Sequence, residues 1–290
     1  MRLDAPFDLD FSLCCGQIFR CKKILGWWYV VSGDKVFKIR QSGDTLDFEG
    51  VNEEFVKCYF GLNDDLAQIS RCVAKDDYIK EALRRFEGLR IVRQDPWECL
   101  ISFICATYKN IAAIELMLSK LSMQFGGKKV FDGKEFYIFP TVEKLAFASE
   151  EGLKACGLGY RAKYVQATAK KIHAEKIDLE SFKALPYLDA RKALVEFPGV
   201  GLKVADCVLL FSMGKTEAFP VDVWVLKALR QLYFPRRRVT PRRLREFADE
   251  YFGPHAGYAQ QYLFHYMRVA TRPVAQTQRT KPWPPAERKV

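Results

Sequence analysis

The chain has 290 residues and a formal net charge of +11 at pH 7, from 46 Lys and Arg against 35 Asp and Glu. This excess, with a sequence pI near 9.2, indicates an acidic partner: a nucleic acid, an anionic membrane surface or an acidic protein. No run of about 18 apolar residues is present, which excludes a transmembrane helix. The first residues lack the features of a signal peptide, so we expect none.

Nine cysteines, an odd number, are scattered without the spacing of a disulfide framework. They predict reduced thiols and an intracellular protein that acts where its partner is found. The three histidines are not spaced with the cysteines as metal ligands would be, so we expect no metal site. The length suggests two domains or one large domain.

Residues 15–50 alternate between apolar and polar side chains in the manner of strands. The predicted strands are Gln17–Cys21, Trp27–Val31, Lys35–Arg40 and Thr45–Phe48, with hairpin turns at Ser32-Gly33-Asp34 and Ser42-Gly43-Asp44. From residue 52 to 86, apolar residues recur at helical spacing. Residues 1–86 are therefore predicted to form an antiparallel sheet with helices, the first part of an α+β protein.

A helix start is predicted at Asp95-Pro96-Trp97-Glu98, which combines a cap, a first-turn proline and a glutamate at the third position. The residues that follow are apolar nearly all round, so this helix should be central and buried. Further helices are predicted at 111–125, 141–155, 160–174, 179–185, 187–197, 202–213, 223–233, 241–251 and 255–270. Residues 87–271 thus form a helical region, and the basic, proline-containing stretch 272–290 is predicted to be a disordered tail.

The turn Pro198-Gly199-Val200-Gly201 separates two of the predicted helices. Its glycines allow a tight turn that presents backbone N–H groups to the outside. Together with the N-terminus of the following helix, these groups form an anion site, for which a nucleic-acid phosphate is a common occupant.

Lys203 lies in the first turn of that second helix, where the macrodipole is positive. Two interpretations are open: a solvent-facing lysine, or an amine whose ammonium form is disfavoured by the dipole and by apolar neighbours, and which is therefore nucleophilic. Asp222 precedes an apolar-periodic run and is predicted to be an N-cap. The intervening chain is long enough to return Asp222 to the lysine end of the helix.

The segments Pro198–Cys207 and Pro220–Asp222 resemble the helix-hairpin-helix (HhH-GPD) DNA glycosylases, and among them the 8-oxoguanine DNA glycosylase family. The resemblance extends over nearly the whole chain and includes Gly88–Leu100, Ser102–Cys105, Gly157–Val165 and Ala256–Gln260. It implies a TBP-like N-terminal sheet domain followed by a helical glycosylase region, with the helix-hairpin-helix at about 187–213. It also implies a bifunctional enzyme that flips 8-oxoguanine out of duplex DNA, excises it and cleaves the strand by β-elimination.

The resemblance assigns a role to each residue of the motif. Lys203 is the implied nucleophile, which forms an imine with C1′ of the sugar, and Asp222 is the carboxylate that stabilises the developing positive charge. The backbone of Gly199, Val200 and Gly201 is implied to bind a DNA phosphate, in some relatives with a monovalent cation.

A base pocket is also implied by the resemblance. Cys207 and Phe264 would sandwich the flipped base, and Gln260 would hydrogen-bond its Watson–Crick edge. The Gly16 carbonyl would accept the N7–H of 8-oxoguanine, which guanine lacks, so guanine would leave that acceptor unpaired. From the residues alone, Phe264 is instead a core residue and Gln260 a surface residue.

Four further residues are implied to contact DNA. Tyr160 resembles the wedge residue and Arg161 the arginine that contacts the opposite cytosine; without the resemblance they read as a surface pair at a helix N-terminus. Tyr108 and Asn110 lie where the family has three asparagines, and Tyr108 occupies the position that fills the space of the flipped base. Three other family residues, an arginine, a histidine and an aspartate, are replaced by Ala113, Trp224 and Met267, which weakens the expectation of strict pairing with cytosine.

The expected cofactor content is none, because no cysteine follows Cys207 to complete an iron–sulfur cluster. The expected partner is double-stranded DNA containing 8-oxoguanine, and we expect a monomer. Two alternatives remain at this stage: a glycosylase for a different damaged base, and a non-catalytic DNA-binding protein that would need neither Lys203 nor Asp222.

Overall fold

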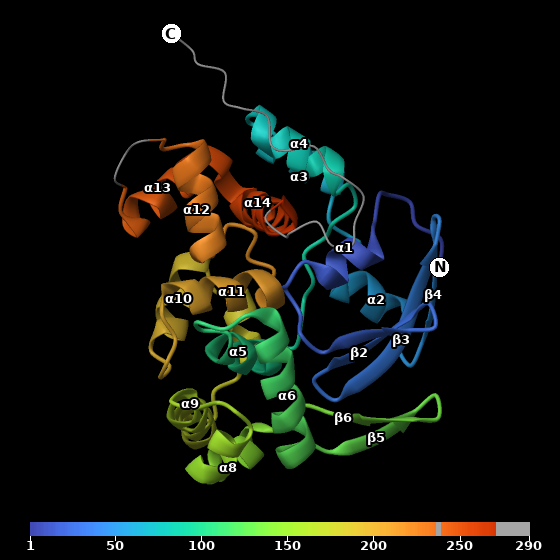
Figure 1. Ribbon diagram of the computed structural model, residues 1–290, viewed down its shortest axis with the longest axis vertical. Helices are drawn as coiled ribbons and strands as arrows, with labels where there is room; N and C mark the ends of the chain where they lie inside the picture. The colour runs from blue at the N-terminus through green and yellow to red at the C-terminus, as the bar shows by residue number, and fades with distance from the viewer. Residues whose placement is uncertain (236–238, 271–290) are drawn as a thin grey trace.

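The computed structural model describes residues 1–235 and 239–270, and the predicted tail lies outside them. The fold is α+β: a four-stranded antiparallel sheet lies on the right in Figure 1 and helices make up most of the remainder. The first elements are α1 (Leu9–Cys14), β1 (Cys21–Ile24), β2 (Trp27–Ser32), β3 (Lys35–Ser42), β4 (Thr45–Glu49), α2 (Glu53–Tyr59), α3 (Leu66–Val73), α4 (Asp77–Arg85) and α5 (Pro96–Cys105).

The later elements are mainly helical. They are α6 (Ile111–Phe125), β5 (Lys128–Phe131), β6 (Lys134–Tyr137), α7 (Val142–Ala146), α8 (Glu150–Ala155), α9 (Arg161–Glu175), η1 (Leu179–Ala184), α10 (Tyr187–Val195), α11 (Leu202–Met213), α12 (Val223–Leu232), α13 (Pro241–Phe252), η2 (Gly253–His255) and α14 (Ala256–Ala270). Within this described part of the chain, no helix is both long and apolar enough to span a membrane.

The four strands pair in sequence order, each antiparallel to the next. Alternation places Val30 opposite Phe37 and Trp28 opposite Ile39, and these side chains are buried in a core shared with α1 and α2. The predicted hairpin turns at Ser32-Gly33-Asp34 and Ser42-Gly43-Asp44 are confirmed. The predicted strand at Gln17–Cys21 is wrong, because β1 begins at Cys21 and the preceding residues form a loop held by side-chain hydrogen bonds.

Two other local predictions need correction, and two elements lack a prediction. The single helix expected at 141–155 is two helices, because the Ser149 hydroxyl accepts a hydrogen bond from the Gly152 N–H at 3.1 Å and so starts a new helix. The helix expected at 179–185 is a 3-10 helix. Helix α1 and the β5–β6 hairpin were not predicted.

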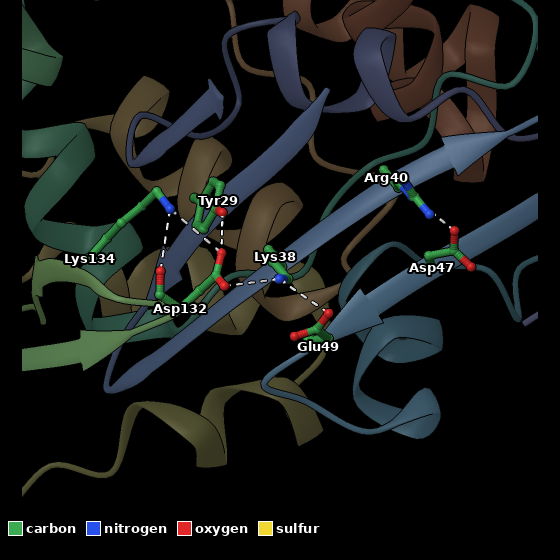
Figure 2. Close-up of polar contacts among 7 residues, drawn as sticks. All are labelled: Tyr29, Lys38, Arg40, Asp47, Glu49, Asp132 and Lys134. Carbon is green, nitrogen blue, oxygen red and sulfur yellow. Dashed lines mark hydrogen bonds and ion pairs between the residues drawn. The ribbon is translucent and has the colours of Figure 1, made fainter. Parts of the chain in front are cut away.

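The β5–β6 hairpin is attached to the main sheet through Asp132 at its turn (Figure 2). The Asp132 carboxylate accepts a hydrogen bond from the Tyr29 hydroxyl and lies 3.2 Å from the Lys38 ammonium, which is also 3.2 Å from Glu49. Lys38 is therefore held between two carboxylates, and the cluster joins β2, β3 and β4 to the hairpin.

Two buried helices form the centre of the molecule. All side chains of α5 except that of Trp97 are buried, as are those of α11 from Val204 onward. The rings of Phe103 and Phe211 stack between them with centroids 5.5 Å apart. A separate core joins α3 and α4 to α12, α13 and α14, with Val73 and Ile79 in contact with the C-terminal helices. In Figure 1, α14 accordingly lies beside α3 and α4.

Candidate active site

The turn between α10 and α11 leads into the N-terminus of α11, where the first backbone N–H groups have no partner within the helix. Gly199 has φ +81° and lies against Tyr164, so a side chain there would collide. Val200 is buried and its N–H donates to the Phe197 carbonyl at 3.1 Å, which closes the turn. Gly201 is the N-cap of α11 and supplies no side-chain cap. The first N–H groups of α11 are thus left for an external anion.

Lys203 projects from this open helix end and is half-buried. Its Nζ lies 5.1 Å from the centroid of the Phe103 ring of α5, so the side chain lies against the protein rather than extending fully into solvent. Burial raises the pKa of two neighbours, Cys207 and Asp222, and the Lys203 charge opposes that rise in both groups. These three side chains therefore share one site.

Asp222 both caps α12 and faces the lysine. Its Oδ1 accepts hydrogen bonds from the Trp224 N–H at 3.0 Å and the Val225 N–H at 2.8 Å, which confirms the predicted N-cap. Burial raises the pKa of the carboxyl, and the Val225 N–H and the Lys203 charge oppose that rise. The chain after α11 thus returns the carboxylate to the lysine end.

Cys207, one turn after Lys203, supplies an uncharged wall. It is 2% exposed, and burial raises the pKa of its thiol to about 11, although the nearby Lys203 lowers it. The thiol is therefore protonated at neutral pH and presents a small, polarisable surface rather than a thiolate.

The loop that carries Gly16 packs against α14. Gly16 has φ +85°, and a Cβ there would lie 2.7 Å from the Arg268 guanidinium and 3.3 Å from the Phe264 ring. The Arg268 guanidinium also donates to the Cys14 carbonyl. Only glycine fits this position, and its backbone lies beside the Phe264 ring, as expected for neighbours in one pocket.

Gln260 is 3% exposed, which corrects the expectation of a surface residue. Its Oε1 is buried and accepts no hydrogen bond from the described residues. Buried polar atoms are nearly always paired, so this acceptor is suited to a hydrogen-bond donor on a bound ligand. Helix α14 also touches the lysine helix directly, because Gly257 packs against Leu210.

Arg161 points into the protein. It is 3% exposed, its guanidinium donates to the Thr107 carbonyl, and it lies 4.4 Å from the centroid of the Tyr160 ring. The surface interpretation of this residue is therefore wrong, and in this conformation it supports the α5–α6 connection. Tyr160 is 50% exposed.

Tyr108 and Asn110 lie in that connection. Tyr108 is 90% exposed and has φ +54°, a strained conformation for an aromatic residue. Asn110 caps α6, because its side chain accepts from the Ala113 N–H at 2.9 Å. The structure thus places Tyr108 on an outward-facing turn.

Sequence reasoning missed Asp206, which is completely buried on α11. Its Oδ1 accepts from the Tyr187 hydroxyl at 2.9 Å and lies 3.7 Å from Arg191. Burial raises the pKa of this carboxyl to about 6. The sequence signal that could have found Asp206 is a carboxylate within a helix whose other residues are mostly apolar.

In the described residues, no group of three or more His, Cys, Asp or Glu side chains is arranged to hold a metal.

Two family models together match most of the chain. The model of the 8-oxoguanine DNA glycosylase N-terminal domain matches residues 2–100. That of the HhH-GPD superfamily base excision DNA repair proteins matches residues 101–254, which is more than half of the chain. The division between the two models falls inside α5, so both contribute to the buried central helix.

Similar proteins have been described in other organisms. A probable N-glycosylase/DNA lyase of Methanothermobacter thermautotrophicus is 34% identical over 67% of this chain and 68% of its own. An N-glycosylase/DNA lyase of Arabidopsis thaliana is 37% identical, over 66% of this chain and 55% of its own length. The chain thus matches little more than half of the plant relative.

A solved structure is similar over nearly the entire fold. The Clostridium acetobutylicum 8-oxoguanine glycosylase/lyase, in complex with double-stranded DNA containing cytosine opposite 8-oxoguanine, has a TM-score of 0.88 and 37% identity, covering 92% of this chain and 94% of that one. The fold and both family models therefore indicate the same family. The chain belongs to the HhH-GPD superfamily of base excision DNA repair proteins and carries the N-terminal domain of the 8-oxoguanine DNA glycosylases.

Proposed function

We propose that this protein is a bifunctional DNA glycosylase and β-lyase that excises 8-oxoguanine from duplex DNA. The observation that carries the proposal is the position of Lys203 beside Asp222 at an uncapped helix N-terminus. The relatives named as N-glycosylase/DNA lyases and the 8-oxoguanine complex of the Clostridium enzyme support the same reaction and substrate. The protein would act wherever the cell keeps its DNA.

The reaction follows from these two side chains. The Lys203 nitrogen uses its lone pair to form a bond to C1′ of the flipped nucleotide, and the bond between C1′ and the base breaks with its electron pair leaving on the base, which takes up one of the two protons that the amine nitrogen loses. The bond between C1′ and the ring oxygen O4′ then breaks, O4′ takes up the second amine proton, and the nitrogen forms an imine with C1′. The imine acidifies C2′, so that loss of a proton there expels the 3′ phosphate. Asp222 carries the negative charge that stabilises the cationic sugar, and its cap hydrogen bonds hold it in place.

For the pocket, we propose that the base lies between Cys207 and Phe264. The buried acceptor of Gln260 is suited to an N–H on the Watson–Crick edge. The Gly16 carbonyl is proposed to accept the N7–H that distinguishes 8-oxoguanine from guanine. A site built around one hydrogen bond discriminates because the wrong base leaves a buried group unpaired.

For the DNA strand, we propose that Gly199, Val200 and Gly201 bind a phosphate next to the lesion. A monovalent cation between the turn carbonyls and the phosphate is compatible with this arrangement, since the Phe197 and Pro198 carbonyls each accept one hydrogen bond and retain a lone pair. Tyr108, Asn110, Tyr160 and Arg161 are proposed to contact DNA where the base has left, and Arg161 must then release Thr107.

Borohydride trapping tests the proposal. The protein is incubated with a duplex containing one 8-oxoguanine opposite cytosine, and in parallel with undamaged and abasic duplexes. A covalent adduct is expected on the damaged and abasic duplexes and should be absent with Lys203→Gln. The matched control is Lys171→Gln, which removes a charge near the same turn, where Lys171 donates to the Glu196 carbonyl at 3.4 Å; it should trap normally. An adduct on the abasic duplex alone would indicate a different base, and tight binding without any adduct would indicate a non-catalytic protein.

A further inference from the structure

The loop between α1 and β1 carries Gly16 but contains no helix or strand. Its backbone groups are buried against α14 and α5, so they need hydrogen-bond partners from elsewhere in the chain. Glutamine side chains supply several of them. The Cys15 carbonyl accepts from Gln261 Nε2 at 3.1 Å, and the Gln17 carbonyl accepts from Gln94 Nε2 at 2.8 Å.

The peptide groups on both sides of the Gly16 carbonyl are thus held by buried amides. Because neighbouring peptide planes share Cα atoms, fixing the two outer planes restricts the direction of the one between them. Glycine has no side chain that could hold this loop, so the direction of the Gly16 carbonyl is set by the two hydrogen-bonded peptide groups beside it.

Gln17 anchors this arrangement with its own side chain, which is completely buried. Its Nε2 donates to the Ser12 carbonyl at 2.7 Å and to the Arg90 carbonyl at 2.8 Å, and its Oε1 accepts from the Val92 N–H at 3.0 Å. Both donor hydrogens and the acceptor are used. One side chain thus joins α1, the Gly16 loop and the extended segment that leads into α5.

Gln94 connects this loop to the lysine helix. Its backbone N–H donates to the Phe211 carbonyl of α11 at 2.8 Å, and its Nε2 lies 3.3 Å from the same oxygen. Since Nε2 also bonds the Gln17 carbonyl, a short hydrogen-bonded path links the loop that holds Gly16 to the helix that carries Lys203. Gln94 therefore connects the position of the Gly16 loop to that of the helix that carries Lys203.

We propose that Gln17 and Gln94 are positioning residues that set the selectivity for 8-oxoguanine by orienting the Gly16 carbonyl. Neither residue touches the base. The proposal rests on the proposed function, because it assigns the discriminating hydrogen bond to that carbonyl. A backbone shift of a few tenths of an ångström lengthens that hydrogen bond but leaves Lys203 and Asp222 in place.

The test compares excision of 8-oxoguanine with cleavage of an abasic duplex in single-turnover reactions of the full chain. Gln94→Met removes the side-chain bonds to the loop, to α11 and to the Cys99 thiol of α5 but keeps the backbone bond to Phe211, and Gln17→Met removes the anchor itself. Both should lower the 8-oxoguanine rate about tenfold or more, the equivalent of one hydrogen bond, with little change in abasic cleavage. A general loss of folding would reduce both rates, whereas a misdirected Gly16 carbonyl would reduce only the excision of 8-oxoguanine.

Gln41→Met is the matched control. Gln41 makes similar bonds on the other side of α1, accepting from the Leu9 N–H at 2.8 Å and donating to the Phe7 carbonyl at 2.7 Å. It should leave the ratio of the two rates unchanged. An unchanged ratio of the two rates in Gln94→Met would overturn the proposal. If Gln17→Met does not fold, Gln94→Met alone decides the test. A wild-type protein that cleaves abasic DNA but does not excise 8-oxoguanine would instead overturn the proposed substrate, and this inference with it.

Discussion

The Asp222 carboxylate lies between the backbone of α12 and the Lys203 amine. Its Oδ1 takes both capping hydrogen bonds, from Trp224 and Val225. Asparagine has the same side-chain oxygen and caps helices about as well as aspartate. The two duties of this residue, capping and charge stabilisation, can therefore be separated by substitution.

We expect Asp222→Asn to fold with near-normal stability and to lose about 10²-fold or more of its excision rate, because the cationic sugar loses its counter-charge. Asp222→Ala should lose activity to a similar degree and also about 1 kcal/mol of stability. Single-turnover rates and urea unfolding curves measure the two effects. An active Asp222→Asn protein would show that the carboxylate serves only as a cap.

At the scale of elements, the turn between α10 and α11 contains two glycines with different constraints. Gly199 has φ +81° and would place a Cβ 2.7 Å from the Tyr164 side chain, whereas a Cβ at Gly201 would meet nothing within 4 Å. The first glycine is required by the fold. The second leaves open the space in front of the α11 N-terminus, where a phosphate would approach.

Gly199→Ala should destabilise the protein by about 1–3 kcal/mol through strain and the contact with Tyr164. Gly201→Ala should change stability by less than about 1 kcal/mol but weaken DNA binding about tenfold, because its methyl group obstructs the phosphate. Thermal unfolding and equilibrium binding to an abasic-analogue duplex distinguish them. If Gly201→Ala binds the duplex with wild-type affinity, the phosphate does not bind at this turn.

The contact of α11 with α10 and α13 contains the buried Asp206. Burial raises its pKa from 3.8 to about 6, opposed by Arg191 and Tyr187 of α10 and Arg245 of α13, while Asp249 of α13 acts in the same direction as burial. A carboxyl with a raised pKa binds its proton more tightly in the folded state. Its contribution to the free energy of unfolding is fully present below pH 3.8 and is lost as the pH rises through about 6.

Asp206→Asn should remove this pH dependence, because the amide stays neutral and can still accept from Tyr187. Relative to wild type, its free energy of unfolding should improve by at most about 3 kcal/mol between pH 4 and pH 7. Urea unfolding at several pH values measures this difference. Parallel stability curves for the two proteins would mean that Asp206 is not the group responsible.

At the scale of the whole molecule, the net charge of +11 should dominate non-specific attraction to DNA. Each phosphate neutralised releases a counterion, so affinity should fall steeply with salt, by at least about tenfold between about 50 and 200 mM. Fluorescence anisotropy with an undamaged duplex measures the slope. A flat dependence would mean that the basic residues do not face the strand.

Patterns local in the sequence determined much of this protein. The period of apolar residues predicted most of the helices, and turn residues predicted two of the β-hairpins, because these features depend on neighbours along the chain. The turn around Gly199, the lysine after it and the cap at Asp222 were identified for the same reason. Where a local bond broke the pattern, as at Ser149, the prediction failed.

Contacts between distant segments decided the rest. Gln17 bonds Arg90 and Val92, and Arg161 turns inward to Thr107; no periodicity signals either contact. Burial of a polar side chain becomes favourable only when the fold supplies its partners, so the sequence pattern does not reveal that Gln17 anchors this loop. The sequence determined which chemistry the chain carries, and the tertiary structure decided which polar groups hold it in position.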